Sequence, residues 1–415
     1  MYCERRIYIF ILLTKYDKIF MERKIKMKTL KDESLKIHVG GKIAIKPKVS
    51  INNHTDLSLV YSPGVAYPSL EIAKDPNKAY LYTSKSNTVA IISDGSAVLG
   101  LGDIGPLAAL PVMEGKCLLF KKFAGIDAIP IVLKTKDVDE IVQTIQHLSP
   151  SFGGVNLEDI SFPRCIEIEK RLVETLDIPV FHDDQRGTAI VCAAALISAV
   201  KLVGKNFKDL KVAILGSGAA GTSIAKQLKL MGVGTIYACN SKGIISKNKT
   251  LHPSIVQMVN DNIIDSFDNY EKDSIEEILI GADVFIGVSK GNLVTSEMID
   301  KMSDQPIVFA LANPDPEISF LEVKRSKAFI YATGRSDYPN QINNVLAFPG
   351  VFRGVLDAGY KKITDEMCIQ ASYAIASLVS EEKITPEYII PSAFDSDVVK
   401  AVSKAIIQGE KANEI

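Results

Sequence analysis

The sequence predicts an α/β protein whose C-terminal part carries a doubly wound parallel sheet. Three observations support this fold class. At 415 residues the chain is long enough for two or three domains of about 150 residues each. Short β-branched runs alternate with helical patterns along most of its length. A glycine loop at 216–221 stands between an apolar strand pattern and an Ala-rich helix pattern, an order typical of a βαβ unit.

The first 27 residues are expected to be an extension, either disordered or an incorrectly assigned start, because Met21 and Met27 offer later starts. The apolar run Ile7–Leu13 follows a charged start as in a signal peptide, but no small-residue cleavage site comes after it. The run is also well below the roughly 20 residues that span a bilayer. An organellar address is the alternative interpretation.

A first α/β domain is expected over residues 28–185. Apolar runs predict four strands, and a spacing of three to four residues predicts an amphipathic helix. Strands are expected at 89–92, 129–133 and 178–181, with the end of another strand at 156–160, and the helix is expected at 138–148. The dipeptide Asp94-Gly95 directly after the first of these strands is a turn signal.

A second domain is expected over residues 186–415. It opens with a helix at 187–203, whose centre Ile190–Val200 is the longest apolar stretch outside the extension and is interpreted as a buried helix. Strands are then expected at 212–215, 235–239, 282–287 and 307–311, with helices at 222–231 and within 362–412. This order predicts a doubly wound sheet followed by C-terminal helices.

Composition excludes several classes of function. Lys and Arg number 48 and Asp and Glu 49, so the formal charge is -1 and no global basic field exists to hold nucleic acid. The six cysteines stand singly, with no C-x-x-C pair, which argues against a disulfide framework and a zinc knuckle. They fit a reducing compartment, and we expect a cytoplasmic location. Five histidines without an H-E-x-x-H pair argue against a zinc hydrolase.

Two stretches match the G-x-G-x-x-G pattern, and their contexts differ. In the loop at 216–221, Gly216 would make the tight turn, Gly218 would let a pyrophosphate approach, and Gly221 would let helix and strand pack closely. The whole loop, with Ser217, Ala219 and Ala220, is therefore predicted to bind a dinucleotide at a helix N-terminus.

The other match, at 100–105, follows a turn signal and runs into Pro106 and Pro111. We expect no second parallel strand at the right distance after it. The stretch is interpreted as a turn-rich connection that shapes a substrate pocket.

The residue at the end of the second strand of the βαβ unit bears on the cofactor. A carboxylate there would bind the ribose 2′-hydroxyl and repel a 2′-phosphate. This chain has Asn240, followed by Ser241 and Lys242, which favours NADP, with NAD as the alternative. A simply solvated Lys242 is an equally good interpretation, because lysines are usually exposed.

Two acidic pairs, Glu158-Asp159 and Asp183-Asp184, lie at the ends of strand-like segments. Carboxylates at the carboxyl ends of parallel strands face the crevice where α/β proteins bind ligands. Hard oxygen donors of this kind suit Mg²⁺ or Mn²⁺. On spacing alone, helix caps or solvated loops remain the alternative.

Six motifs occur in one order, and together they closely resemble malic enzyme in its short-subunit, bacterial-type form over residues 28–410. They are Tyr61–Val65, Asp94–Pro106, Met113–Lys116, Phe152–Ile160, Phe181–Gln185 and Thr333–Asn344. The resemblance implies oxidative decarboxylation of (S)-malate to pyruvate and CO₂, reduction of NAD(P), a divalent metal ion and a homodimer.

The resemblance also implies roles for single residues. Tyr61 before Ser-Pro-Gly matches the general acid, and Lys116 in Met-Glu-Gly-Lys matches the general base. For the base we expect a lysine that is desolvated and placed near other cations, so that its pKa is lowered and it can take the C2 hydroxyl proton. Tyr61 would then protonate C3 and convert enolpyruvate to pyruvate.

Further matches concern the metal and the substrate. Glu158, Asp159 and Asp184 match the metal ligands, with Asp183 as their neighbouring support. Two asparagines, Asn313 in Ala-Asn-Pro and Asn344 in Asn-Gln-Ile-Asn-Asn, match residues that contact the substrate and the nicotinamide side.

The chain departs from the family pattern at Arg186, where the family usually has His, and at Asn240, where many members have Asp. The first change adds a cation near the expected metal site, and the second leaves the choice of cofactor open. Two other functions compete with oxidative decarboxylation. One is malolactic decarboxylation with NAD kept bound and lactate released, and the other is a non-catalytic nucleotide sensor on the same fold.

Overall fold

The structure, a computed structural model, describes residues 30–98 and 100–411, and it divides into two units, Met1–Val49 and Ser50–Ile415. The described part of the first unit is helical at 30–38 and continues without regular structure to residue 49. The expected extension at 1–27 lies outside the described residues.

The second unit begins with a run of short helices, residues 54–82, which we call the arm. It contains α2 (His54–Val60), α3 (Ala66–Lys74), the short turn η1 (Pro76–Lys78) and α4 (Ala79–Tyr82). The side chain of Asn53 caps α2 by accepting a hydrogen bond from the Asp56 backbone. After η2 (Ser84–Asn87) the chain enters the first sheet, and the Lys85 ammonium donates to the carbonyl oxygens of Ser149, Pro150 and Phe152.

The first sheet has four parallel strands in the order β2-β1-β3-β4. They are β1 (Thr88–Ser93), β2 (Asp127–Val132), β3 (Gly154–Leu157) and β4 (Val180–His182). Helices α5 (Pro106–Ala124), α6 (Val138–Leu148) and α7 (Arg164–Thr175) connect them, with the turn η3 (Ser149–Ser151) before β3. Every residue of β1 is buried, as expected for the centre of a parallel sheet covered on both faces.

The expectation about the stretch at 100–105 was wrong in one respect. A second parallel strand does follow it, because β2 pairs with β1 along its whole length, from Thr88 beside Asp127 to Ser93 beside Val132. Pro106 occupies the first turn of α5, where no backbone N–H is needed, and Pro111 is accommodated inside the helix. The two prolines therefore lie within a helix that leads to the second parallel strand.

The second sheet has six strands in the order β10-β9-β8-β5-β6-β7, all parallel except the antiparallel edge pair β6 and β7. They are β5 (Lys211–Leu215), β6 (Thr235–Asn240), β7 (Gly243–Ile244), β8 (Val284–Gly287), β9 (Ile307–Ala310) and β10 (Ile330–Thr333). The connections include η5 (Phe207–Asp209), α9 (Ala219–Leu230), α10 (Pro253–Asn260), α11 (Ile275–Leu279), α12 (Ser296–Ile299) and α13 (Phe320–Val323). The order reverses at β5, which confirms the doubly wound sheet and marks the place where such sheets bind ligands.

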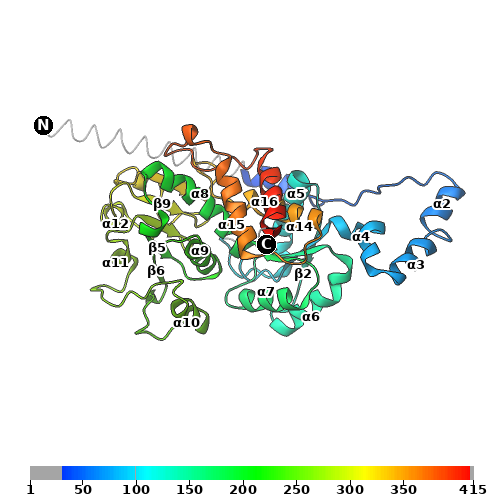
Figure 1. The fold of residues 1–415 in the computed structure, drawn as a ribbon, viewed down its shortest axis with the longest axis horizontal. Helices are drawn as coiled ribbons and strands as arrows, with labels where there is room; N and C mark the ends of the chain where they lie inside the picture. Colours follow the sequence, from blue (N-terminus) through cyan, green and yellow to red (C-terminus); the bar gives the residue numbers. More distant parts are fainter. Residues whose placement is uncertain (1–29, 99, 412–415) are drawn as a thin grey trace. The chain divides into compact units, whose positions relative to one another are not determined.

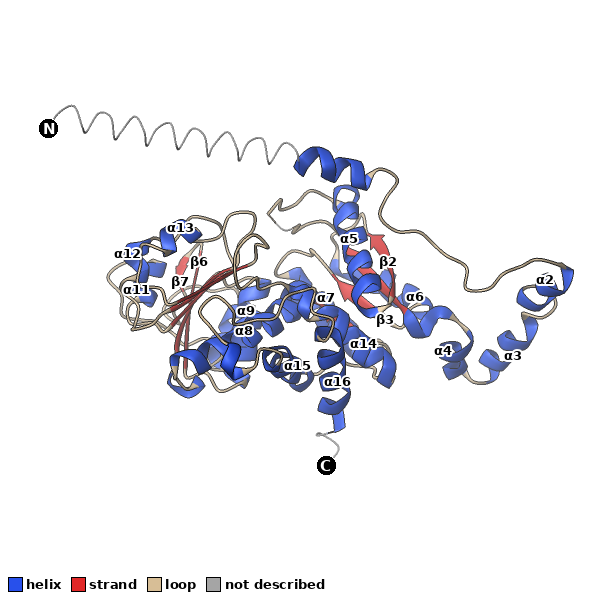
Figure 2. Ribbon diagram, turned by 90° about the horizontal axis from the view of Figure 1, so that it is seen from above, coloured by secondary structure: helices blue, strands red, loops and turns tan. Residues whose placement is uncertain are grey.

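A central helix, α8 (Thr188–Val203), joins the two sheets (Figure 2). Twelve of its residues are buried, and it shares one hydrophobic core with residues of β1 and β5 such as Val89 and Val212. Among the described residues, 183–203 is the one helical stretch long and apolar enough to cross a membrane, and 72% of its apolar window is buried inside the protein. This burial is that of a core helix.

The C-terminal part is helical and packs on this core (Figure 1). It contains η6 (Asn344–Leu346), α14 (Phe348–Ala358), α15 (Asp365–Ser377), η7 (Glu381–Lys383) and α16 (Val398–Lys411). Phe348 and Phe352 of α14 lie against Phe120 of α5, with ring centroids 4.7 and 5.3 Å apart. The last helices therefore help to position α5.

Candidate active site

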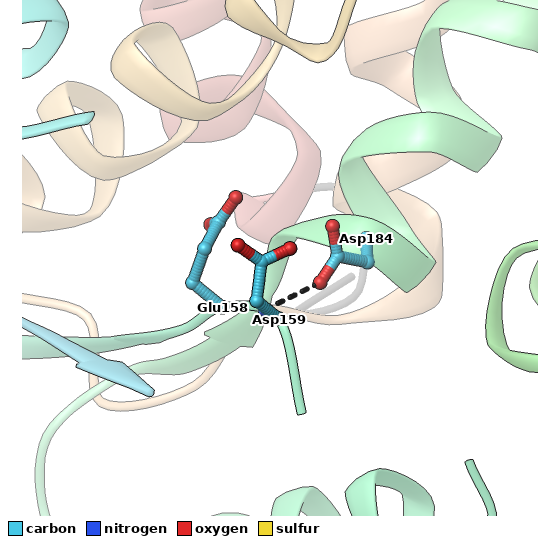
Figure 3. Close-up of side chains that lie close together, drawn as sticks. All are labelled: Glu158, Asp159 and Asp184. Atoms are coloured by element: carbon cyan, nitrogen blue, oxygen red, sulfur yellow. Dashed lines mark hydrogen bonds between the residues drawn. The ribbon is translucent and has the colours of Figure 1, made fainter. Parts of the chain in front are cut away.

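Three carboxylates meet where two neighbouring strands end. Glu158 and Asp159 follow β3, and Asp184 lies in η4 (Asp183–Gly187), a π-helical turn that follows β4. Because β3 and β4 are parallel neighbours, their carboxyl ends lie at the same edge of the sheet. One oxygen of each side chain lies within 4.8 Å of the others (Figure 3). The Asp159 backbone, at φ 54°, donates a hydrogen bond of 2.8 Å to Asp184 Oδ2.

Burial and mutual repulsion make this cluster costly without a cation. Burial raises the pKa of Glu158 and of Asp184, and it raises the pKa of Asp159 to about 9 together with the charges of Asp184 and Glu158. Asp159 Oδ2 is buried and has no hydrogen-bond partner. Three clustered carboxylates with an unpartnered buried oxygen fit a hard divalent cation such as Mg²⁺ or Mn²⁺.

Lys116 lies on the buried face of α5 and is 8% exposed. Its ammonium is 2.5 Å from Asp183 Oδ2 and 2.7 Å from Glu158 Oε1, and it lies over the Phe348 ring, 4.4 Å from the centroid. Burial alone lowers the pKa of Lys116, but the attraction of the Asp183 and Glu158 carboxylates outweighs burial and raises it. The expected depression by neighbouring cations is therefore wrong, because the neighbours are anions.

Asp183 pairs with Lys116 and precedes Asp184 in η4. Its side chain is fully buried, its Oδ1 has no hydrogen-bond partner, and burial raises its pKa well above the ordinary value. An added Cβ at Gly187 would lie 1.9 Å from the same Oδ1, so a glycine is needed beside it. His182 is also buried, and burial lowers its pKa, which keeps its ring neutral.

A cavity of about 850 Å³ lies against the cluster, and both glycine loops border it. Its walls include Asp159 and Asp184 of the cluster and the two asparagines expected at the substrate, Asn313 and Asn344. The two glycine-containing segments contribute Ser96–Val98, Gly100, Gly102, Ala219 and Ala220. Gly100 has φ 72°, and an added Cβ would lie 2.8 Å from the Asn313 carbonyl oxygen. The first loop can approach the second sheet this closely only as glycine.

The loop at 216–221 has the geometry expected of a dinucleotide loop. Gly216 has φ 116°, and an added Cβ at Gly221 would lie 1.7 Å from the Gly216 carbonyl oxygen, whereas at Gly218 it would meet nothing within 4 Å. Asn240, at the end of β6, donates from Nδ2 to Ser217 Oγ over 2.8 Å and accepts from the Lys242 backbone. Asn240 therefore ties the loop to the second strand of the βαβ unit.

Comparison with known proteins identifies the family. Residues 40–173 match the malic enzyme N-terminal domain, and residues 185–409 match the malic enzyme NAD binding domain. The chain belongs to the malic enzyme family. It is thus an oxidoreductase with a Rossmann-type domain that binds a nicotinamide cofactor.

Proteins from other organisms are similar to this malic enzyme over most of its length. It is 51% identical to the NAD-dependent malic enzyme of Geobacillus stearothermophilus, covering 93% of this chain and 80% of that one. It is 52% identical to the bifunctional malic/malolactic enzyme of Bacillus subtilis, covering 91% and 92%. The crystal structure of an NAD-dependent malic enzyme from Thermotoga maritima matches with a TM-score of 0.86 and 47% identity, covering 90% and 98%.

Two residues of this malic enzyme lie elsewhere than expected. Tyr61 forms the C-terminal cap of α2, is 68% exposed and is not among the described residues that line the cavity. Arg186 points into a different cavity of about 490 Å³, where Nε is 2.9 Å from Glu169 Oε1 and the guanidinium donates to the Ile363 carbonyl oxygen. The added cation therefore joins α7 to the loop before α15.

Sequence reasoning missed two supporting side chains in this malic enzyme. Glu317 is fully buried and accepts hydrogen bonds from the backbones of Ser289 and Ala312, at 2.7 and 3.0 Å, which fixes the segment before Asn313. Phe348 lies under Lys116. Neither has a local signal, because each acts on residues distant in sequence.

Proposed function

We propose that this malic enzyme converts (S)-malate to pyruvate and CO₂ with reduction of NADP or NAD, and that it depends on Mg²⁺ or Mn²⁺. The observation that carries the proposal is Lys116, buried between Asp183 and Glu158 at the edge of a three-carboxylate cluster. Hydrolysis by an activated nucleophile would need a different set of residues. A lysine with carboxylate partners, beside a candidate cation site and a dinucleotide loop, suits the oxidation of a hydroxy acid.

Each residue has a proposed role. Glu158, Asp159 and Asp184 would hold the metal ion, which as a Lewis acid would stabilise negative charge on the substrate oxygen. Lys116 takes the C2 hydroxyl proton as hydride leaves for the nicotinamide. Asp183 is proposed to receive a proton from Lys116, because its Oδ2 lies 2.5 Å from the ammonium.

The later step needs an acid. Tyr61 is proposed to protonate C3 after CO₂ departs, which converts the enol to pyruvate. Asn313 and Asn344, both on the cavity wall, are proposed to contact the substrate and the nicotinamide. The residues would act across two domains, proposed at 28–185 and 186–415, in a cytoplasmic protein.

The cofactor proposal rests on Asn240. A neutral side chain at the end of β6 does not repel a 2′-phosphate, which supports NADP, with NAD as the alternative. The loop at 216–221, including Ser217, Ala219 and Ala220, would hold the pyrophosphate at the N-terminus of α9.

The test is pyruvate formation from (S)-malate with Mn²⁺, run in parallel with NADP and NAD while reduced nicotinamide is followed. We expect equal amounts of pyruvate and reduced cofactor. The second candidate is malolactic decarboxylation, favoured by the bifunctional malic/malolactic relative in Bacillus subtilis. Lactate without net reduced cofactor would establish that activity, and neither product would refute both.

A further inference from the structure

The cavity that both glycine loops border is lined mainly by uncharged and acidic side chains. Asp159, Asp184 and Asp315 contribute carboxylates, and Lys290 is the one cation among the described residues that line it. Both proposed ligands are anions, because malate is a dicarboxylate and the cofactor carries a pyrophosphate. A divalent cation at the carboxylate cluster would attract the malate. The cofactor phosphates therefore need another source of positive charge.

Lys290 is available to supply that charge. It follows the end of β8 by three residues, in the segment 288–294, and its side chain is exposed. In the described part of the chain, no carboxylate forms an ion pair with its ammonium. Two other lysines of the same domain are less suited. Lys226 of α9 pairs with Asp365, and Lys242 is not among the described residues that line the cavity.

The segment that carries Lys290 lies against the dinucleotide loop. The Val288 backbone donates to the Leu215 carbonyl oxygen over 2.9 Å, directly before that loop. An added Cβ at Gly216 would lie 2.6 Å from the Val288 carbonyl oxygen, and an added Cβ at Gly221 would lie 3.3 Å from Val288 Cγ2. Lys290 is therefore two residues from the point where the segment and the loop touch.

The loop itself offers only partial charges to a phosphate. Gly218 is the N-cap of α9, and no side chain caps this helix end. The first backbone N–H groups of α9 are thus left for an anion, and the helix dipole favours one there. Ala219 and Ala220, at the start of α9, line the same cavity as Lys290. A full positive charge on Lys290 would add to these partial charges.

The position of Lys290 is fixed by its neighbours on both sides. The buried Glu317 carboxylate accepts a hydrogen bond of 2.7 Å from the Ser289 backbone. An added Cβ at Gly291 would lie 2.6 Å from the Asp315 carbonyl oxygen, so the segment packs closely on the chain that follows β9. Binding an anion therefore requires the ordering of the Lys290 side chain alone, which keeps the entropy cost low.

We propose that Lys290 binds the pyrophosphate of the nicotinamide cofactor, together with the backbone donors at the start of α9. This inference rests on the proposed function. The substrate carboxylates are a less suitable target, because the carboxylate cluster follows strands of the first sheet, whereas Lys290 follows β8 of the second sheet beside the dinucleotide loop. NAD and NADP share the pyrophosphate. Lys290 therefore raises the affinity for both cofactors, while Asn240 distinguishes them.

Calorimetric titration of a Lys290→Gln protein tests this contact without turnover. Affinity for NAD and for NADP should each fall about tenfold or more, because a charge-assisted hydrogen bond is lost. Lys290→Arg retains the charge and should recover most of the affinity. The wild-type affinity should also fall more steeply with added salt than that of Lys290→Gln. Unchanged affinity for both cofactors, or a loss confined to NADP, would overturn the proposal.

Lys208→Gln is the matched control. Lys208 is also exposed, but it lies in η5 just before β5, at the edge of the sheet opposite to the loop. Its replacement removes the same charge from the same domain and should leave the affinity for both cofactors unchanged. An equal loss in Lys208→Gln and Lys290→Gln would reduce the effect to net charge and contradict a specific contact.

Steady-state kinetics distinguish the cofactor from the substrate as the partner of Lys290. In Lys290→Gln the KM for the cofactor should rise, and the KM for malate should change little. A rise in the KM for malate at unchanged cofactor affinity would assign Lys290 to the substrate and overturn the proposal. If the wild-type chain binds the cofactors but makes no pyruvate, the proposed function fails and the titrations still decide the role of Lys290. A wild-type chain that binds neither cofactor would overturn both.

Discussion

Two opposing effects act on the pKa of Lys116. Burial disfavours its charge, while Asp183 at 2.5 Å and Glu158 at 2.7 Å favour it, and the carboxylates prevail. A lysine in this state acts as a base only if a neighbour takes its proton. The Asp183 carboxylate, in direct contact with the ammonium, is placed to do so.

Substitutions at Lys116 and Tyr61 should affect different steps of the proposed reaction. Lys116→Ala should lower malate oxidation by about 100-fold or more, because general acid–base groups contribute on that scale. Tyr61→Phe should lose the overall reaction chiefly at tautomerisation, and it should fail to exchange the methyl protons of pyruvate for deuterium. Proton exchange by NMR and reduced nicotinamide by absorbance measure the two steps. Near-normal turnover of both variants would refute the assignment.

The carboxylate cluster predicts a metal-linked pH dependence of stability. The pKa of Asp159 is about 9 in the folded protein, whereas the pKa of an unfolded aspartate is about 3.9. The folded state therefore holds the extra proton between these values, and the free energy of unfolding of the metal-free protein should fall as pH rises through this window. Mn²⁺ at about 100 times its Kd should restore ~2.7 kcal/mol, most fully at high pH, where the carboxylates are charged.

Thermal melts with and without chelator, from pH 6 to 9, measure this effect. Asp159→Asn should stabilise the metal-free protein at high pH and abolish the response to Mn²⁺. Asp139→Asn is the control, because the Asp139 side chain is 82% exposed and lies outside the cluster. A wild-type response to Mn²⁺ in Asp159→Asn would remove Asp159 from the ligand set.

Asn240 carries the cofactor prediction. Asn240→Asp should lower kcat/KM for NADP by about tenfold or more, because a carboxylate repels the 2′-phosphate, and should change kcat/KM for NAD little. The Ser217 hydroxyl can donate to the new carboxylate, so the loop should remain tied to β6. Initial rates with both cofactors measure the ratio, and an unchanged ratio would place the 2′-phosphate elsewhere.

At the level of elements, two glycines of the loop at 216–221 have different roles. Gly221→Ala should destabilise the protein by about 1–3 kcal/mol, because its Cβ would overlap the Gly216 carbonyl oxygen. Gly218→Ala, with open space around the Cβ, should keep wild-type stability and weaken cofactor binding. Denaturant unfolding and calorimetry distinguish the two effects, and equal stability of both variants would contradict the packing role of Gly221.

Elements whose residues carry their own signal could be predicted from the sequence. The helix at 138–148 is predicted at the bounds that α6 has, and β1, β5 and β6 each contain the short apolar run that marks a parallel strand, at 89–92, 212–215 and 236–239. Helix α5 was missed because its two prolines resemble a break. The arm could not be predicted because its helices are short and have no buried face.

At the level of the molecule, the candidate site depends on contacts between distant segments. The carboxylates could be grouped in advance, because parallel strands end at one edge of a sheet. The Lys116–Asp183 pair joins residues 67 positions apart, and the sign of the pKa shift of Lys116 follows from its contacts with Asp183 and Glu158. The resemblance to the family supplied Lys116 but not the charges around it.

The buried helix α8 has a consequence for how this protein can be dissected. Asp184, a proposed metal ligand, lies just before α8, and twelve residues of α8 are covered by elements from both sides. A fragment that ends at residue 187 would also lose the α14 phenylalanines that pack on Phe120. We expect fragments 50–187 and 188–411 to be insoluble or to lack near-ultraviolet circular dichroism when expressed singly. The two family domains are thus not autonomous modules, and engineering that swaps one for a homologue must carry α8 and its neighbours with it.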